Sequence, residues 1–529
     1  MVSNNLYFLI DNLQDIFLVI GALIISYIIY FYISYFTRSN PLPGPLPLPI
    51  VGNLLVYSGD AGKLAQELRK KYGDIYEIYL GSTRTVWLNR ADMVDEIMLS
   101  NNRIAENFNL DEVGVSDKGV LFNRNLDDVM YHRKIFDKTI LTPQFVKNII
   151  PITQSLFKEL ESLWKDYGCL EGDKEIDFCL WMERLGFECM LKLLTNFRAY
   201  ALINYYNFLN PKQKVTVPES PLSSVVTEGF IKNIHNYFPI VHHFFFSVKS
   251  LLRAPGKRKN TNYFLKEKYS LDSNIMNIIK LRKSQIENSS IDELRENQDL
   301  LTQFITMNTE KDITKGITDD FHSEPMSDGN IRQNLVEELN SGIVTSSSFL
   351  CHMIYFVARH PKVLQQIQEE LANVIGTNED SEITFEDLNK LKYCRAVITE
   401  VGRLHTFVPI NARISSKPVV IDSYKFPVNQ HFIINATAIH LDPKNWNNPE
   451  EFNPSRFLSN DKNTLMMFGR GLRSCPGRNL AMTQLKILMA LIYRKYDIEL
   501  VDPTAPIKYK YAIISLCYEL KVRIKLRKN

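Results

Sequence analysis

Residues 468–478 read Phe-Gly-Arg-Gly-Leu-Arg-Ser-Cys-Pro-Gly-Arg and lead into residues 479–491, where apolar residues recur at helical spacing. Cys475 therefore lies at, or just before, the start of a helix. Backbone N–H groups and the positive end of a helix both favour a thiolate over a thiol. Gly471 and Gly477 let the backbone turn tightly and approach a flat ligand closely. The stretch suits a thiolate that binds a metal, although a single cysteine in a glycine-rich turn is also compatible with an inert, buried side chain.

The stretch matches the longer signature F-x-x-G-x-R-x-C-x-G at five positions, namely Phe468, Gly471, Arg473, Cys475 and Gly477. For five fixed positions, a chance match in a chain of this length has odds of about one in ten thousand. On this signature the chain resembles the cytochrome P450 family, in its membrane-anchored microsomal type from eukaryotes, and the resemblance covers nearly the whole chain. It implies haem b as the cofactor, with Cys475 as the axial ligand of the iron. Arg473 would bind a haem propionate, and Phe468 and Gly477 are the other haem-binding positions of the loop.

The resemblance also implies an activity, that of a haem-thiolate monooxygenase which inserts one oxygen atom of O2 into a lipophilic small molecule. The chain has no flavin or nicotinamide fingerprint of its own, because Gly469-Arg-Gly471 belongs to the cysteine loop. Electrons would come from a separate NADPH-dependent flavoprotein reductase, with cytochrome b5 as a further donor. Basic residues attract an acidic partner of this kind, and the chain offers four that could equally be ordinary solvated charges: Lys134, Arg470, Arg478 and Lys486.

Composition limits the class of protein. The 529 residues carry a formal net charge of +3, with charged residues spread along the chain, so we expect no nucleic-acid partner. The length alone suggests several domains, but no linker-like stretch supports a division. The seven cysteines are an odd number and contain no C-x-x-C pair, which argues against a disulfide framework and against structural zinc. A reducing, cytosol-facing compartment fits this cysteine usage.

The N-terminal part of the chain predicts a membrane anchor. Residues 16–36 are apolar and uncharged, and as a helix they would span about 31 Å, enough for the hydrocarbon core of a bilayer. Asp11 and Asp15 precede this run and Arg38 follows it, so the positive-inside rule leaves the bulk of the chain in the cytosol. A cleaved signal peptide is the competing interpretation, but no basic region precedes the run. We expect a single-pass protein of the endoplasmic reticulum membrane, with an anchor at residues 1–40, a stiff proline-rich hinge at 41–49 and a catalytic domain at 50–529.

The rest of the chain is predicted to be mostly helical. Helical patterns dominate between residues 90 and 410. Residues 75–88 read as two strands around a tight turn, and strand-like runs return at residues 418–421 and 431–434. The expected fold class is therefore mainly α (α+β), a helix-rich domain with small β-sheets. The resemblance makes this the cytochrome P450 fold, preceded by one transmembrane helix.

Two segments look irregular. Residues 287–327 are polar with an embedded apolar turn at 300–305, which favours a loop between helices. Residues 238–246 are apolar and are followed by Arg253 and the basic residues 257–259, which resembles the family loop that touches the membrane and admits substrate. Core packing followed by a solvated basic turn explains the same pattern.

A carboxylate and two arginines form a second constellation. Glu400 and Arg403 are three residues apart on a predicted helix and so share one face, which on a surface is worth roughly 0.2–0.5 kcal/mol. Residues 449–457, PEEFNPSRF, resemble the P-x-R-F segment of the family. The resemblance implies that Arg456 joins Glu400 and Arg403 in a buried triad that supports the haem from its proximal side. The role of the triad would be structural.

Residues 342–346, Gly-Ile-Val-Thr-Ser, lie in a helical run and resemble the central helix that crosses over the haem in this family. A hydroxyl at mid-helix can bond the carbonyl four residues earlier, which opens the helix and leaves room for dioxygen. Thr345 fits that role, and Gly342 and Ser346 complete the catalytic candidates. A Ser/Thr patch on an exposed helix face is the alternative.

The chain departs from the family pattern in this helix. Ser341 replaces the usual alanine, and Val344 stands where Asp or Glu is common. Oxygen activation needs two protons, and Val344 can supply none. Ser346, water, or a carboxylate elsewhere on the helix, such as Glu337 or Glu338, would have to relay them.

Two more arginines are candidates for haem propionates. Residues 127–134 resemble the W-x-x-x-R helix of the family, but Val129 replaces the tryptophan, so only Arg133 carries over. Arg413 matches a position where the family places another propionate-binding cation. Together with Arg473 this gives three positive groups for two carboxylates, although a single arginine also fits an ordinary surface position.

Two other functions stay open. A haem-thiolate isomerase, lyase or dehydratase acting on an oxygenated lipid would need neither O2 nor a reductase, and Val344 favours it while Thr345 opposes it. A membrane-anchored haem-binding sensor or carrier would not need the Gly342/Thr345 patch. The substrate is not specified by the sequence. Steroids, terpenoids, fatty acids and xenobiotics are all compatible with the candidate pocket segments at residues 107–122, 335–345 and 406–412.

Overall fold

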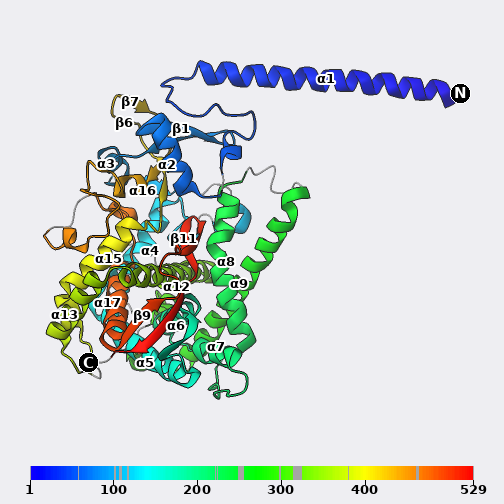
Figure 1. The fold of residues 1–529 in the computed structure, drawn as a ribbon. Helices are drawn as coiled ribbons and strands as arrows, with labels where there is room; N and C mark the ends of the chain where they lie inside the picture. The colour runs from blue at the N-terminus through cyan, green and yellow to red at the C-terminus, as the bar shows by residue number, and fades with distance from the viewer. Residues whose placement is uncertain are drawn as a thin grey trace.

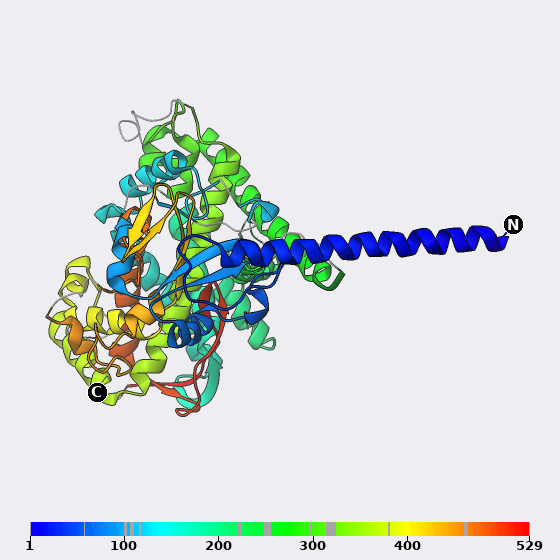
Figure 2. The same ribbon diagram turned by 90° about the horizontal axis from the view of Figure 1, so that it is seen from above.

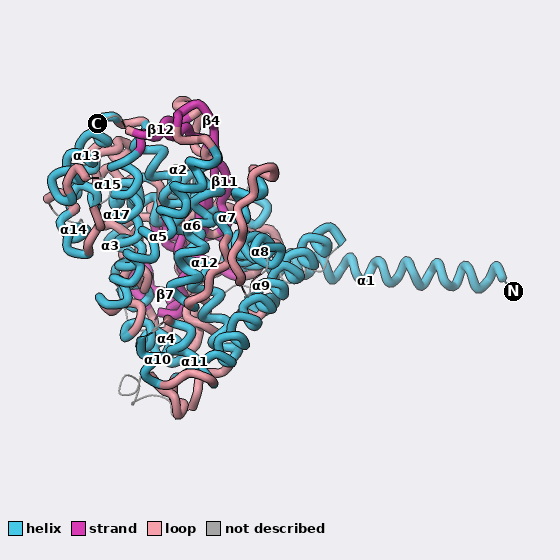
Figure 3. Tube along the Cα trace, turned by 90° about the horizontal axis from the view of Figure 1, so that it is seen from below, coloured by secondary structure: helices cyan, strands magenta, loops and turns pink. Residues whose placement is uncertain are grey.

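The computed structural model describes most of the chain. It covers residues 2–57, 59–99, 103–105, 110–115, 118–220, 222, 224–247, 255–296, 299–313, 324–378, 381–459 and 464–527. Helices make up the larger part of this structure, and the strands are short (Figures 1 and 3). The predicted fold class, mainly α with small sheets, is confirmed.

The helices follow the chain in three groups. The N-terminal group is α1 (Val2–Phe36), α2 (Ala61–Tyr72), α3 (Ala91–Leu99), α4 (Leu126–Lys138), α5 (Pro143–Tyr167), α6 (Phe178–Thr195) and α7 (Ala201–Leu209). The middle group is α8 (Ser224–Phe245), α9 (Pro255–Glu287), α10 (Ile291–Glu296), α11 (Leu300–Thr306) and α12 (Asp328–Ala358). The C-terminal group is α13 (Pro361–Ile375), α14 (Phe385–Lys390), α15 (Lys392–Leu404), α16 (Ala436–His440) and α17 (Arg478–Lys495). Short 3-10 helices lie at Leu54–Val56, Leu110–Val113, Pro454–Phe457 and Gly471–Arg473.

The strands form small sheets that join distant parts of the chain. The largest has the order β1-β2-β8-β5-β3, with β1 (Ile75–Leu80), β2 (Thr83–Leu88), β8 (His431–Asn435), β5 (Ile410–Ser415) and β3 (Arg103–Ala105). A second has the order β4-β12-β9, with β4 (Glu171–Asp177), β12 (Lys521–Leu526) and β9 (Tyr496–Leu500). Two hairpins complete the set, β6 (Val419–Ile421) with β7 (Tyr424–Phe426) and β10 (Lys508–Ala512) with β11 (Ile514–Glu519). The strands predicted at residues 75–88, 418–421 and 431–434 are confirmed.

Helix α12 runs through the middle of the molecule (Figure 1). It begins where the Ser327 side chain accepts a hydrogen bond from the Asn330 N–H at 3.3 Å, and it ends shortly before Pro361, which opens α13. It packs against α6, α9, α15 and β11. Leu335 and Leu350 are fully buried in these contacts. A helix that is apolar on most sides must be covered on most sides, which explains its central position.

Helix α1 projects from the rest of the chain as an isolated rod (Figures 1 and 2). Among the described residues, two helices are long and apolar enough to cross a membrane, Asp15–Phe36 and α12. Asp15–Phe36 has none of its apolar window buried and α12 has 67% buried, so α12 is a core helix and Asp15–Phe36 is the candidate anchor. After the anchor, residues 41–47 form neither helix nor strand, as the proline-rich sequence predicts.

Two segments differ from the sequence-based expectation. Residues 238–245 are not a loop: they belong to α8, and Phe238, Val241 and Phe244 are buried. The prediction of a membrane-touching loop here is wrong, and the core-packing alternative holds. Arg253 lies outside the described residues, and residues 257–259 belong to α9.

The polar stretch at residues 287–327 is also more regular than predicted. It contains the short helices α10 and α11, and the apolar residues Leu300, Leu301 and Phe304 of α11 are buried. Their burial in the core stabilises α11, a helix that the polar sequence on either side of it did not indicate. Residues 314–323 lie outside the described part of the chain.

Candidate functional site

A tight turn and the start of α17 position Cys475. The Cys475 N–H donates to the Phe468 carbonyl at 2.7 Å, which closes the turn. Gly469 and Gly471 have φ angles of +70° and +67°, a region that side chains with a Cβ rarely adopt, so this turn requires glycine. Because α17 begins at Arg478, the sulfur lies next to a helix N-terminus, as the sequence predicts.

The Cys475 side chain is exposed, although protein surrounds its thiol. Of the seven free cysteines it alone is exposed, yet desolvation raises the pKa of its thiol to about 11. The charge of Glu338 raises this pKa further, while the Gly477 N–H and Arg133 lower it. At neutral pH such a thiol keeps its proton unless a metal replaces it, so the position fits a metal ligand.

Three arginines from different elements gather beside this cysteine. Arg413 on β5 is 9% exposed, and burial followed by the charge of Arg473 lowers its pKa to about 10. Burial and the charge of Arg133 lower the pKa of Arg473 to about 10 as well, with Glu337 acting in the opposite direction. Arg133 on α4 donates to the Ser474 carbonyl at 2.8 Å.

Arg413 and Arg473 lack counter-ions in the described part of the chain. Arg413 donates to the Ala412 carbonyl at 2.8 Å and Arg473 to the Leu121 carbonyl at 2.9 Å, and no carboxylate of the described residues forms an ion pair with either. Burying a cation without an anion costs free energy, so we expect a ligand at this site to supply negative groups. A thiol for iron and adjacent cations for two propionates together fit haem b.

Gly477 gives a further sign of a ligand. Its φ is −77°, and an added Cβ would lie 3.8 Å from the Cys475 Sγ, an ordinary contact. Nothing within the described protein therefore demands glycine at this position. Close approach of a ligand remains the physical reason for it.

The predicted triad is present and buried. The Glu400 and Arg403 side chains are 0% exposed, and Arg403 binds the carboxylate through two nitrogens at 2.7 and 2.8 Å. Arg456 adds one bond to Glu400 at 3.0 Å and donates its other nitrogens to backbone carbonyls of residues 447–451. The triad thus joins α15 to the segment before the cysteine loop, with Arg456 binding the carboxylate through one nitrogen only.

His440 is a member of this network that the sequence did not reveal. It is fully buried, its Nδ1 bonds the Thr406 hydroxyl at 2.9 Å, and its Nε2 accepts from the Met466 N–H at 2.8 Å. Burial and the charge of Arg403 lower its pKa to about 3, so the ring is neutral and Nε2 can accept. His440 therefore ties the triad to the chain that leads into the cysteine loop. A single histidine outside any motif gave no signal for this role.

The distal candidates lie on α12. The Thr345 hydroxyl donates to the Ser341 carbonyl, which is the predicted bond to the residue four positions earlier. Ser346 is 9% exposed and Val344 is 5% exposed, which excludes an exposed Ser/Thr patch. At Gly342, an added Cβ would lie 2.4 Å from the Met190 Cε. Its missing side chain makes room for α6.

The two carboxylates of α12 have different surroundings. Glu337 is 1% exposed and accepts from the backbone N–H groups of Val120 and Leu121, both at 2.8 Å. Burial raises its pKa to about 7. Glu338 forms no hydrogen bond with any described residue, and burial together with the charge of Glu337 raises its pKa to about 8. Glu337 therefore binds the loop at Val120 and Leu121, whereas the Glu338 carboxyl group is available to exchange a proton.

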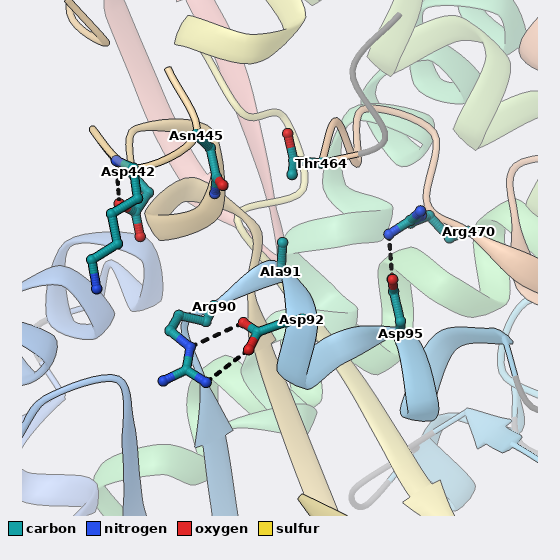
Figure 4. Close-up of a pocket in the computed structure, with 9 residues that line it drawn as sticks. Arg90, Ala91, Asp92, Asp95, Asp442, Asn445, Thr464 and Arg470 are labelled. Carbon is teal, nitrogen blue, oxygen red and sulfur yellow. Dashed lines mark hydrogen bonds and ion pairs between the residues drawn. The ribbon is translucent and has the colours of Figure 1, made fainter. Parts of the chain in front are cut away.

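A polar pocket of about 470 Å³ lies next to the cysteine loop (Figure 4). In it Arg470 pairs with Asp95 of α3, and Arg90 pairs with Asp92. Lys486 is 8% exposed and donates to the Leu388 carbonyl. The predicted basic surface is therefore wrong for Lys486, which is buried, and it is weakened at Arg470, which is already paired.

The described structure thus brings Cys475, Arg133, Arg413 and Arg473 together. Glu338 on α12 acts electrostatically on Cys475, which places it near these residues. Phe468 is half-buried, with the Arg478 guanidinium 5.8 Å from the centre of its ring. Of the pocket segment predicted at residues 107–122, residues 107–109 and 116–117 lie outside the described part.

Comparison with known proteins agrees with this geometry. The family model of cytochrome P450 matches residues 42–520. The steroid 17-alpha-hydroxylase/17,20 lyase of Felis catus is 26% identical over 510 residues, which are 92% of this chain and 92% of that protein. The sugiol synthase of Salvia miltiorrhiza is 26% identical over 511 residues, 93% of this chain and 95% of that protein. The salviol synthase of Salvia pomifera is 26% identical over 505 residues, 90% of this chain and 91% of that protein.

Proposed function

The chain belongs to the cytochrome P450 family and is a monooxygenase with haem b, and on this premise we propose that Cys475 is the thiolate ligand of its haem iron. The observation that carries the proposal is the position of the thiol at the start of α17, exposed although the surrounding protein desolvates it. The adjacent helix N-terminus and the Gly477 N–H would favour the thiolate form that a metal ligand requires.

The cations beside the cysteine orient the cofactor. When bound, haem b supplies the activation of O2 and the transfer of one oxygen atom to the substrate. Arg413 and Arg473 bind its propionates through charge-assisted hydrogen bonds and thereby gain the anions that they lack among the described residues. Arg133, which bonds the cysteine loop through the Ser474 carbonyl, adds a third positive charge.

The triad holds the proximal side in place. Glu400 joins Arg403 of α15 to Arg456, and His440 connects the same cluster to Met466, close to the turn that presents Cys475. A fixed ligand geometry of this kind is a structural contribution, and no member of the triad donates or accepts a proton in the reaction.

Side chains of helix α12 donate and relay the protons that the reaction needs. Glu338 has a raised pKa and holds a proton at neutral pH that it can release towards the site. The Thr345 and Ser346 hydroxyl groups lie two turns further along the helix and orient water that carries the proton. Val344 contributes only apolar surface.

The anchor and the partners complete the proposal. Residues 1–40 hold the protein in the endoplasmic reticulum membrane as a single-pass anchor, residues 41–49 are the hinge, and residues 50–529 are the catalytic domain in the cytosol. The protein depends on a redox partner, which we propose is an NADPH-dependent flavoprotein reductase, with cytochrome b5 as a further donor. The apolar, exposed helix at Asp15–Phe36 supports the anchor.

The substrate is a lipophilic small molecule. The names of two relatives, a steroid 17-alpha-hydroxylase/17,20 lyase and a sugiol synthase, support a hydroxylation or related oxidation without selecting one compound. Val344 is the one observation that favours an isomerase, lyase or dehydratase acting without O2. Isotopically labelled O2 separates the two functions, because only a monooxygenase places the label in its product.

Cys475→Ala tests the ligand assignment. We expect the reduced wild-type protein to give the carbon monoxide difference band of a thiolate-ligated haem, and the variant to lose it. Cys394→Ala is the matched control, because Cys394 is buried at a distance from the site and should leave the band unchanged. A wild-type band at the position of an imidazole-ligated haem, or a thiolate band that persists in Cys475→Ala, contradicts the proposal.

A further inference from the structure

Three buried cysteines form a cluster outside the site described above. Cys179 lies in the first turn of α6, Cys351 in α12 and Cys517 in β11, and their exposed fractions are 1%, 0% and 2%. Their Sγ atoms all lie within 4.8 Å of one another. The residues are far apart in the sequence, so the cysteine spacing that argued against structural zinc could not show this cluster. Cys475 does not belong to it.

Hydrogen bonds hold the backbone of the cluster in place. The Cys517 N–H donates to the Ser348 hydroxyl at 2.7 Å, and that hydroxyl donates to the Ser515 carbonyl at 3.3 Å. Asp177 accepts from the Cys179 N–H at 3.2 Å and from the Leu520 N–H at 3.1 Å. The strand and both helices are therefore fixed to one another by groups other than the three sulfurs. The cluster is preorganised.

The spacing of the sulfurs suits one metal ion. With a metal–sulfur distance of about 2.3 Å, three sulfurs in a plane around the ion lie roughly 4 Å apart. Small side-chain rotations bring sulfurs that are already within 4.8 Å to that spacing. No oxygen or nitrogen ligand of the described residues belongs to the group, and sulfur ligands select soft, thiophilic cations.

A metal bound here would displace the protons of the three thiols. A divalent cation would offset most of the negative charge of the three thiolates within their buried surroundings.

His352, the neighbour of Cys351 in the sequence of α12, is a buried histidine. It is 0% exposed, and its Nδ1 bonds the Ser348 carbonyl at 2.8 Å, so Nδ1 carries the proton and Nε2 carries a lone pair. Nε2 has no partner among the described residues, and the ring interacts electrostatically with Cys517. The ring of His352 stacks on that of His405, with 3.6 Å between the ring centres, and His352 is not one of the three ligands.

We propose that Cys179, Cys351 and Cys517 form a binding site for a thiophilic divalent cation, represented by Zn²⁺. The bound ion cross-links α6, α12 and β11. It thereby fixes α12 one to two turns beyond Thr345 and holds the β10–β11 hairpin against it. Simple packing of three cysteines as small apolar side chains is the alternative, and it predicts no affinity for metal.

Metal analysis of the haem-loaded, full-length protein tests the proposal. The protein is purified with a reducing agent, exposed to Zn²⁺ and dialysed, and its zinc is counted per haem. We expect one zinc per chain in the wild type, and loss of that zinc in Cys179→Ser and in Cys517→Ser. Cys189→Ser is the matched control, since Cys189 is a buried cysteine of the same helix outside the cluster, and it should keep its zinc.

A second measurement uses the wild type alone and does not depend on the folding of a variant. Titration with Cd²⁺ should produce the ultraviolet absorption of cadmium–thiolate bonds at one equivalent and raise the thermal midpoint, because an ion that binds only the folded state stabilises it. A wild type that binds neither ion, or a Cys179→Ser/Cys517→Ser double variant that binds as much as the wild type, overturns the proposal. So does a disulfide between two of these cysteines in protein isolated under reducing conditions.

Discussion

At the scale of single residues, the surroundings of Glu337 and Glu338 differ in a way that the sequence does not show. Sequence reasoning named Glu337 and Glu338 together, because neighbours on a helix look equivalent in one dimension. The structure distinguishes them, since Glu337 binds two backbone N–H groups and Glu338 binds no described residue. Of the two, Glu338 is therefore the residue that we propose for proton delivery.

Glu338→Gln should slow product formation by roughly 100-fold, the lower end of the range for a positioned general acid. The raised pKa of about 8 means that Glu338 is protonated at neutral pH and loses its proton as the pH rises through that value. Wild-type turnover should accordingly fall above about pH 8, and the variant should lack this decline. Product formed per O2 consumed, measured from about pH 6 to pH 9, checks both effects.

Glu337→Gln serves as the control for this prediction. It should change protein stability through the loop at Val120 and Leu121 and leave the alkaline decline in place. If Glu338→Gln keeps wild-type coupling and the same pH profile, Glu338 is not the proton donor.

Thr345→Ala tests the hydroxyl that bonds the Ser341 carbonyl within α12. We expect O2 consumption to continue while the product formed per O2 falls several-fold, because the hydroxyl that guides proton delivery in the reaction is missing. Ser347→Ala is a close match, since Ser347 makes the same type of bond, to the Ile343 carbonyl at 2.6 Å, but packs against Gly186 of α6. Equal losses of coupling in both variants would point to helix geometry instead of the Thr345 hydroxyl.

At the scale of elements, local patterns predicted some helices and strands and missed others for physical reasons. The helix after Cys475 and the strands β1 and β2 have one buried face or a clear turn, so their periodicity is visible in the sequence. Helix α8 contains an aromatic run that is buried on several faces, and this removes the periodic contrast that identifies a helix. Helix α11 is short and takes its stability from long-range packing, which no local window contains.

The candidate site divides in the same way. Cys475 and the turn around it follow from local spacing, and the roles of Arg133, Arg413 and Arg456 came from the family resemblance. His440 and the cluster of Cys179, Cys351 and Cys517 were not predictable, because each depends on contacts between elements far apart in the sequence.

Glu400→Ala should destabilise the protein by about 3–5 kcal/mol, because it leaves buried Arg403 without its carboxylate. The triad joins α15 to the segment before the cysteine loop, so haem retention should fall together with stability. Denaturant unfolding and the haem-to-protein ratio measure the two effects. Glu519→Ala removes an exposed pair with Lys508 and should cost less than about 1 kcal/mol. If Glu400→Ala lowers the free energy of unfolding by a similarly small amount, the triad does not stabilise the segment before the cysteine loop.

At the scale of the whole molecule, the anchor is not the only apolar surface that the structure exposes. Within the hinge and between it and α2, five large apolar side chains are 45–76% exposed: Leu46, Leu48, Ile50, Leu55 and Val56. These residues come after α1, which ends at Phe36. Arg38 pairs with Glu77 of β1 at 2.6 Å, so the chain is attached to the first sheet soon after the candidate anchor helix. An exposed apolar patch beside a membrane anchor is expected to insert into the membrane surface.

Deleting residues 2–40 should therefore convert the protein from an integral to a peripheral membrane protein without abolishing membrane binding. The truncated chain should keep the carbon monoxide band and still sediment with lipid vesicles. Leu55→Ser/Val56→Ser in the truncated chain should weaken vesicle binding by roughly tenfold or more, because each inserted side chain of this size contributes about 1.5–3 kcal/mol. Leu458→Ser/Leu526→Ser alters side chains that are 52% and 53% exposed outside this patch and should leave binding unchanged. If the truncated protein stays entirely in solution, α1 alone holds the enzyme on the membrane and the apolar residues after the hinge do not contribute.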